Sequence, residues 1–161
     1  MIFTSRRRAQ MLHTREVLSL QSEATPEATR GMLSRVMAEL KDLMTAERAG
    51  MIEVALAEIV NNIVEHAYAE CPDGEIRLTA LVDDTLLRFE IRDDGLPLPG
   101  GTLPPGRPAD LGGGRQALPE GGFGWLLIRS IARDLSYARQ DGVNRLTVDF
   151  DLSPTGGRAR R

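Results

Sequence analysis

Lysine is nearly absent from this sequence of 161 residues, in which Lys41 is the single example. The neighbours of Lys41 do not form the glycine-rich loop, ending in Gly-Lys-Ser or Gly-Lys-Thr, that P-loop proteins wrap around phosphates. Because that loop needs its lysine as a point charge on the phosphates, the sequence excludes P-loop chemistry.

Cysteine, histidine and aromatic residues are also scarce. Cys71 is the single cysteine, which excludes an intrachain disulfide and makes a reducing cytoplasm the expected location. With His13 and His66 as the only histidines, we expect no His/Cys zinc site. A net charge of −3, with one Trp, two Tyr and four Phe, offers neither a basic groove nor many stacking rings. Direct nucleic-acid binding is therefore not expected.

Long apolar runs are missing as well. No stretch approaches 18 consecutive apolar residues, so the sequence predicts no membrane span. The arginine cluster at 6–8 is followed by residues 9–14 (AQMLHT), which are not the apolar core of a signal peptide. At 42% hydrophobic and 27% charged residues, the composition is that of an ordinary globular domain.

Hydrophobic periodicity predicts three helices and five strands. Thr25 and Pro26 carry a helix-start signal, since threonine caps a helix and proline suits its first position. The expected elements are a strand at 15–21, helices at 25–44 and 46–69, a hairpin of strands 75–82 and 85–93, a helix at 125–134, and a hairpin of strands 136–139 and 144–152.

Strands that arrive as hairpins favour an α+β fold. We expect a two-layer α/β sandwich, with the helices on one face of a mixed, mostly antiparallel sheet. The domain is expected over 15–152, after an N-terminal extension at 1–14 and before a basic, flexible tail at 153–161.

Glycine and proline are concentrated in one segment. Residues 97–122 hold 8 of the 16 glycines and 6 of the 9 prolines. A segment this poor in regular structure inside a small domain is usually functional or a linker.

A polar pair interrupts the largely apolar second helix. Glu58 and Asn62 are four residues apart and project from one helix face, with Asn61 beside them. Partial burial suits a carboxylate to act as a general base, and the Asn62 carbonyl oxygen is a ligand that Mg²⁺ accepts alongside phosphate and water. The same pattern also fits the solvent-facing edge of an amphipathic helix.

An aspartate ends the first hairpin. Asp93 has the parity of Leu87, Phe89 and Ile91, so its side chain is expected to face the core layer. A buried carboxylate there can accept a hydrogen bond from the exocyclic amine of adenine, and Gly95 lets a flat ring approach the backbone. An ordinary Asp-Gly turn explains the same residues.

Glycines precede the third predicted helix. In Gly121-Gly122-Phe123-Gly124, the backbone amides can point at an anion, and the helix N-terminus adds partial positive charge. A flexible loop end with a helix cap is the simpler interpretation of this segment alone.

Together the three motifs resemble the GHKL superfamily of ATP-binding domains, which includes gyrase-type topoisomerases, heat-shock chaperones, mismatch-repair proteins and histidine kinases. Glu58-x-x-x-Asn62 resembles the N box, Asp93-x-Gly95 the G1 box and Gly122-x-Gly124 the G2 box. The segment at 97–122 lies where the superfamily has its ATP lid, and the resemblance covers about residues 15–152.

Within the superfamily, the sequence most resembles the anti-sigma-factor serine/threonine kinases. The resemblance rests on the segments NNIVEHAY, DDGLP, GGFGWLLIRSIARDLSYAR and VNRLTVDF. It implies that ATP and Mg²⁺ bind between the helices and the sheet, with Asn62 on the metal and Asp93 on adenine. The amides of Gly122, Phe123 and Gly124 would hold the phosphates. Glu58 would accept the proton of a serine or threonine as it attacks the γ-phosphate.

The implied substrate is an anti-sigma-factor antagonist of the STAS type, and the implied sequestered partner is a sigma factor or an analogous regulator. A homodimer is expected, because family members commonly dimerise. Thr147 is the candidate for a family threonine near the nucleotide, although its parity opposes that of Leu146 and Val148. His66 is a further candidate to reach the nucleotide, with a purely structural histidine as the alternative.

Two other functions stay open. One is an ATP-gated protein-binding module, in which nucleotide orders the lid and changes partner affinity without phosphotransfer. The other is a plain ATPase or a histidine-kinase-like catalytic domain that works with a partner. The presence of both Glu58 and Asn62 favours the protein kinase, because a binding module could lose the glutamate.

Overall fold

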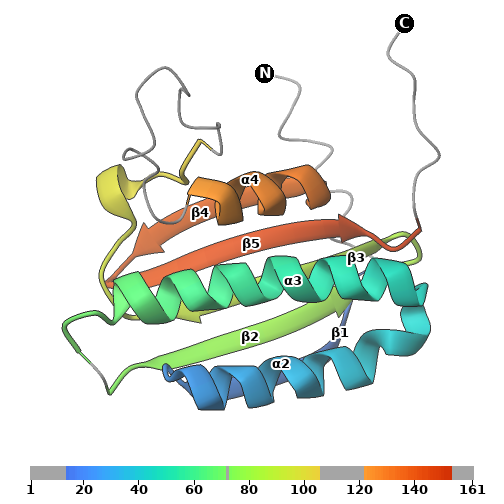
Figure 1. The fold of residues 1–161 in the computed structure, drawn as a ribbon, viewed down its shortest axis with the longest axis horizontal. Coiled ribbons are helices and arrows are strands. Elements are labelled where there is room, and N and C mark those ends of the chain that lie inside the picture. Colours follow the sequence, from blue (N-terminus) through green and yellow to red (C-terminus); the bar gives the residue numbers. More distant parts are fainter. Residues whose placement is uncertain (1–13, 72, 106–121, 154–161) are drawn as a thin grey trace, which may run out of the picture.

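A five-stranded antiparallel sheet with helices on one face forms the domain in a computed structural model, which describes residues 14–71, 73–105 and 122–153 (Figure 1). The strand order is β1-β2-β3-β5-β4. The strands are β1 (Arg15–Glu23), β2 (Glu75–Val82), β3 (Leu86–Asp93), β4 (Asp134–Gln140) and β5 (Val143–Asp151).

Two hairpins supply four of the five strands. β2 and β3 form one, and β4 and β5 form the other through an Asp141-Gly142 turn in which both residues have positive φ, 52° and 81°. This conformation suits the twist of a tight hairpin, and the Asp-Gly pair tolerates it. β3 and β5 then pair across the two hairpins and bring Asp93 opposite Asn144.

The helices are α2 (Pro26–Leu40), α3 (Ala46–Asn62) and α4 (Gly122–Ile131), with 3₁₀ turns η2 (Lys41–Leu43) and η4 (Pro99–Gly101) and a π-helical turn η3 (Ile63–Ala67). Thr25 caps α2 by accepting a hydrogen bond from the Ala28 N–H, and Thr45 caps α3 in the same way. In Figure 1 all three α-helices cover one face of the sheet, with α3 between α2 and α4.

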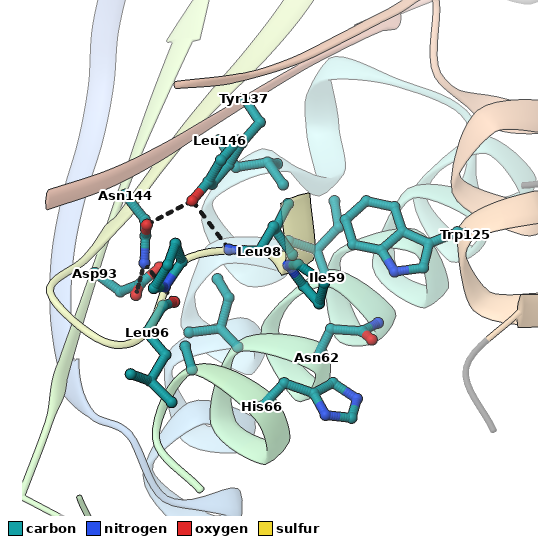
Figure 2. Close-up of a pocket in the computed structure, with 14 residues that line it drawn as sticks. Ile59, Asn62, His66, Asp93, Leu96, Leu98, Trp125, Tyr137, Asn144 and Leu146 are labelled. Atoms are coloured by element: carbon teal, nitrogen blue, oxygen red, sulfur yellow. Dashed lines mark hydrogen bonds between the residues drawn. The ribbon is translucent and has the colours of Figure 1, made fainter. Parts of the chain in front are cut away.

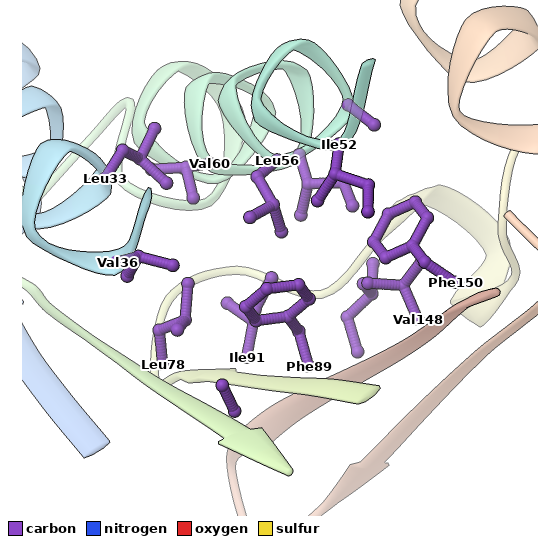
Figure 3. Packing of buried hydrophobic residues seen from close by; sticks show 14 of the residues in the cluster. Leu33, Val36, Ile52, Leu56, Val60, Leu78, Phe89, Ile91, Val148 and Phe150 are labelled. Atoms are coloured by element: carbon purple, nitrogen blue, oxygen red, sulfur yellow. The ribbon is translucent and has the colours of Figure 1, made fainter. Parts of the chain in front are cut away.

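The core lies between these layers (Figure 3). α3 contributes Ile52, Leu56 and Val60, whose spacing of three to four residues faces one side of the helix. β3 contributes Phe89, whose ring meets that of Phe150 edge to face with centroids 6.0 Å apart. The other face of the sheet is polar. It contains Arg88, Glu90 and Arg92, as the period-two alternation predicts.

The α+β sandwich predicted from the sequence is confirmed, with refinements. Every strand pair in the described ranges is antiparallel, so the sheet has no parallel component there. The second predicted helix changes to the π-helical η3 after Asn62, and the third begins at Gly122 and ends at Ile131, earlier at both ends. Residues 1–13, 106–121 and 154–161, which include most of the predicted extension, lid and tail, lie outside the described residues.

Candidate functional site

A pocket of about 450 Å³, its open mouth included, lies between the helices and the β3–β5–β4 edge of the sheet (Figure 2). The predicted site residues Asn62, His66 and Asp93 all line it. The remaining lining residues are Ile59, Ile63, Ala67, Leu96, Pro97, Leu98, Pro99, Trp125, Tyr137, Asn144 and Leu146.

Glu58 and Asn62 occupy the last turns of α3. Both are half-buried, in contrast to the fully buried Ile59 and Val60 on the adjoining face and the exposed Asn61. The Asn62 amide Nδ2 donates to the Glu58 backbone carbonyl at 2.6 Å. This contact uses the amide nitrogen, and no described residue donates a hydrogen bond to the Asn62 carbonyl oxygen.

The π-helical turn η3 follows directly on Asn62. π-Helical turns are rare and frequently occur at functional sites. This one places the exposed His66 on the pocket wall and ends at the buried Tyr68, whose hydroxyl lies 2.7 Å from Asp94 Oδ1. Burial, with this hydrogen bond to the Asp94 carboxylate, raises the pKa of Tyr68 well above its ordinary value, so the phenol stays protonated.

Asp93 ends β3 and is 6% exposed, facing the helix layer as its parity predicts. Its Oδ1 accepts two hydrogen bonds, from the Gly95 N–H at 3.0 Å and from Asn144 Nδ2 at 2.7 Å. Burial raises the pKa of Asp93, and the neighbouring Asp94 carboxylate adds to this, whereas the two hydrogen bonds and Arg139 oppose it. The structure therefore presents a desolvated carboxylate with one oxygen already engaged.

Close packing of the Ala67 backbone, and not the pocket, requires a glycine at position 95. A Cβ built at Gly95 would lie 2.5 Å from the carbonyl oxygen of Ala67, and the next residue, Leu96, donates its N–H to that oxygen at 2.8 Å. The missing side chain thus lets the chain leaving β3 pack against the end of η3. The sequence assigned this glycine to ring approach, and it is absent from the pocket lining.

The glycines of the third motif lie in the first turn of α4, where backbone N–H groups have no partner within the helix. Gly124 faces Glu58, since a Cβ built at Gly124 would lie 2.5 Å from Glu58 Oε2. Phe123 is 64% exposed, and Trp125, two residues further, is buried against the pocket. The structure therefore brings the Glu58 carboxylate and the α4 N-terminus together.

A model of the family described as "Histidine kinase-like ATPase domain" matches residues 22–150 of this chain. The match runs from the end of β1 into β5 and includes all the residues of the pocket. The chain belongs to the histidine kinase-like ATPase family.

Curated relatives of this histidine kinase-like ATPase domain include protein kinases. The serine-protein kinase RsbW of Listeria monocytogenes is 26% identical over 135 residues, which cover 83% of this chain and 86% of the relative. The serine/threonine-protein kinase BtrW of Bordetella bronchiseptica is 32% identical over 116 residues, covering 71% of this chain and 79% of that protein.

A solved structure supports the fold. The RsbU and RsbW domains of Rv1364c from Mycobacterium tuberculosis superpose with a TM-score of 0.57 at 20% identity, covering 84% of this chain and 31% of that one. This chain thus spans about a third of the solved chain. Within the described ranges, none of the helices of this histidine kinase-like ATPase domain is both long and apolar enough to cross a membrane.

The Asn62 carbonyl oxygen is a hard donor of the kind that Mg²⁺ accepts. Across the described residues, no group of three or more His, Cys, Asp or Glu side chains gathers into a metal-binding cluster. An Mg²⁺ ion held at the Asn62 oxygen would take its other ligands from phosphate and water.

Glu58, Gly95, Phe123 and Gly124 do not line the pocket themselves, and of the predicted site residues Thr147 lies on the opposite face of the sheet. It lies on the polar face of β5, opposite Glu90 on β3 and Ser136 on β4, and away from the helices. The position beside Asp93 belongs to Asn144, three residues earlier, which sequence reasoning missed. Its signal was available, because Asn144 has the same parity as Leu146 and Val148, which placed a polar amide in the core layer.

Sequence reasoning also missed Tyr137 and Arg139 on β4 and Arg129 on α4. The Tyr137 hydroxyl accepts a hydrogen bond from the Leu98 N–H at 3.1 Å, and the Arg129 guanidinium donates to the Pro104 carbonyl at 2.8 Å. These bonds hold the described first part of the predicted lid, residues 97–105, to β4 and α4. Arg139 donates to the Gly95 carbonyl at 2.9 Å.

Proposed function

We propose that this protein is an ATP- and Mg²⁺-dependent serine/threonine protein kinase of the anti-sigma-factor type. The observation that carries the proposal is the convergence of a half-buried Glu58 with the first turn of α4, beside a pocket walled by Asn62 and Asp93. The relatives named as serine and serine/threonine kinases supply the substrate class.

The adenine ring is proposed to enter between Asp93 and the apolar wall that Leu146 and Leu98 help to form. The buried Asp93 carboxylate, through Oδ2, accepts a hydrogen bond from the 6-amino group. A 6-oxo group, as in guanine, would instead face the carboxylate with an acceptor, which disfavours GTP. His66 lies on the pocket wall, where it is available to the nucleotide.

The phosphates are proposed to lie between α3 and the first turn of α4, on the N–H groups of Gly122, Phe123 and Gly124. With no lysine in a phosphate loop, these amides and the positive end of the helix dipole are the protein's main attraction for anions. Asn62 offers its carbonyl oxygen to Mg²⁺, which neutralises phosphate charge when bound.

Glu58 is proposed as the general base. It accepts the hydroxyl proton of the substrate serine or threonine while the hydroxyl oxygen forms a bond to the γ-phosphorus. The bond from that phosphorus to the bridging oxygen of ADP breaks, and ADP leaves with the electron pair. Positioning and charge stabilisation supply most of the rate, as in other phosphoryl transfers.

The protein substrate is proposed to be an anti-sigma-factor antagonist of the STAS type, and the regulated partner a sigma factor or analogous regulator. These partners are the ones that the resemblance to anti-sigma-factor kinases implies, and the kinship with RsbW and BtrW, which are named as kinases, supports the kinase activity. We also propose that residues 15–152 form the kinase domain, that the protein is a homodimer, and that it acts in the cytoplasm. Thr147 has no part in it, because it lies on the opposite face of β5.

The test is transfer from γ-labelled ATP with the full-length protein, Mg²⁺ and a purified STAS-type protein encoded beside it. Label on a serine or threonine of that protein is expected. Nucleotide binding without transfer would instead identify an ATP-gated binding module, and release of free phosphate alone would identify an ATPase. A Glu58→Gln protein serves as the matched control, because it keeps the side-chain shape and lacks the base.

A further inference from the structure

Asn144 stands at the centre of a buried hydrogen-bond network that the proposed reaction does not use. It is the second residue of β5, is 3% exposed, and faces the pocket together with Asp93 (Figure 2). Its amide nitrogen donates to Asp93 Oδ1 at 2.7 Å, and it also lies 3.0 Å from the Leu96 carbonyl oxygen. One side chain thus joins the nucleobase carboxylate to the loop that leaves β3.

The opposite end of the amide is held equally firmly. Asn144 Oδ1 accepts from the Tyr137 hydroxyl at 2.6 Å and from Arg139 at 2.7 Å, both on β4. These partners fix the orientation of the amide, because a flipped amide would set its oxygen against the Asp93 carboxylate and its nitrogen against a guanidinium. The amide therefore always offers a donor to Asp93.

This arrangement divides the two oxygens of Asp93 between protein and ligand. Oδ1 receives both of the hydrogen bonds that Asp93 accepts from the described residues, one from Gly95 and one from Asn144. No described residue donates to Oδ2, so within the described part of the chain this oxygen can accept a hydrogen bond from a ligand.

We propose that Asn144 is a positioning residue for nucleobase recognition, which fixes the Asp93 carboxylate so that Oδ2 meets the 6-amino group of adenine. The proposal rests on the proposed ATP function and adds to it the residue that sets base preference. Tyr137 and Arg139 act through Asn144 by holding its oxygen.

The experiment compares the affinity of the full-length protein for ATP with that for purine riboside triphosphate, which lacks the 6-amino group. The wild-type protein is expected to prefer ATP. Asn144→Ala is expected to weaken ATP binding roughly tenfold, as loss of a hydrogen bond to a charged group does, with little effect on the analogue. Arg145→Gln, at the exposed neighbouring position on the polar face, is the matched control and keeps the preference.

A double-variant cycle separates positioning from a general loss of fold. In an Asp93→Ala background, Asn144→Ala is expected to change ATP affinity by less than about twofold, because the two residues act as one unit. If Asn144→Ala does not fold, Tyr137→Phe decides the question, since it removes a single hydroxyl and is expected to shift the preference in the same direction.

The pH dependence of ATP affinity tests the positioning role, because a purely structural role of Asn144 would not change it. ATP affinity is expected to fall as Asp93 becomes protonated, and loss of the Asn144 donor raises the pKa of Asp93, so the fall begins at higher pH in Asn144→Ala. The other charged or titratable groups that act on Asp93 are Asp94, Arg139 and Tyr68. His66 and Tyr137 line the same pocket, and all five groups are unchanged in this variant.

An unchanged base preference together with an unchanged pH profile in a folded Asn144→Ala protein would overturn the positioning role. Failure of the wild-type protein to bind either nucleotide would instead overturn the proposed function. The two failures are therefore distinguishable.

Discussion

The carboxylate of Glu58 lies against the α-carbon of Gly124, so closely that a Cβ on Gly124 would be 2.5 Å from Glu58 Oε2. The two residues are far apart in sequence and come together because α3 packs beside α4 (Figure 1). The absence of a side chain in the first turn of α4 therefore determines where the proposed base can lie.

Gly124→Ala is expected to displace the Glu58 carboxylate while the fold survives, because the clash involves the end of a flexible side chain. Loss of a correctly placed base lowers transfer by roughly 100-fold or more. Label transfer and ATP affinity are measured in parallel, and ATP affinity should change much less. Gly50→Ala, in α3 with open space at its Cβ, is the control, and it is expected to stabilise the protein by about 1 kcal/mol. Equal transfer by both variants would contradict the role of Glu58.

Substitutions of Glu58 and Asn62 are expected to affect different steps, phosphoryl transfer for Glu58 and Mg²⁺-dependent ATP binding for Asn62. Glu58→Gln keeps ATP affinity and loses transfer by roughly 100-fold or more, because only the base is removed. Asn62→Ala loses the oxygen offered to the cation, so the gain in ATP affinity on adding Mg²⁺ shrinks. Asn61→Ala, at the exposed neighbouring position, is the control and leaves both unchanged. Titrations with and without Mg²⁺ measure the difference, and an Mg²⁺ effect that survives Asn62→Ala would exclude Asn62 as the ligand.

Asp93→Asn is expected to stabilise the nucleotide-free protein at neutral pH while weakening ATP binding. The folded-state pKa of Asp93 lies above its unfolded value, so its contribution to stability is present at low pH and is lost as pH rises through the folded pKa. At neutral pH the buried charge therefore costs stability, and asparagine removes that cost. Denaturant unfolding at neutral and at acidic pH measures the effect. The advantage of the variant should shrink as pH falls, and an advantage that grew instead would contradict this assignment of the pKa.

Much of this site follows from local periodicity, and the remainder depends on packing. The helical period places Glu58 and Asn62 on one face, and the strand period turns Asp93 inward, so both were predictable. The contact between Asp93 and Asn144 was not, because it depends on the register of β3 against β5 across 51 residues of sequence. A register shift of one residue would have put Asn144 on the polar face.

Gly95 and Gly124 likewise show what can be predicted from the sequence and what depends on packing. The sequence assigned Gly95 to the approach of a flat ring and Gly124 to amide contacts with an anion, but only packing shows which protein atoms lie against them. At Gly95 the neighbour is the Ala67 backbone, supplied by a π-helical turn that no sequence pattern indicated. At Gly124 it is the Glu58 side chain.

Gly95→Ala is therefore expected to damage the fold, in contrast to Gly124→Ala. Its Cβ would lie 2.5 Å from the Ala67 carbonyl oxygen and 2.8 Å from the Ala67 carbonyl carbon. Both are backbone atoms, so a change of side-chain rotamer cannot relieve the clash. Overpacking of this kind costs about 1–3 kcal/mol of unfolding free energy. The shift would also break the hydrogen bond from the Leu96 N–H to Ala67 and loosen the pocket wall.

Denaturant unfolding and ATP affinity measure this effect, with Gly31→Ala as the matched control. Gly31 lies inside α2, and nothing in the described structure lies within 4 Å of a Cβ built there. The control is expected to gain about 0.5–1 kcal/mol in unfolding free energy through helix propensity, with ATP affinity unchanged. If Gly95→Ala were as stable as the control and bound ATP normally, the packing of the β3 exit against η3 would not be what shapes the nucleobase end of the pocket.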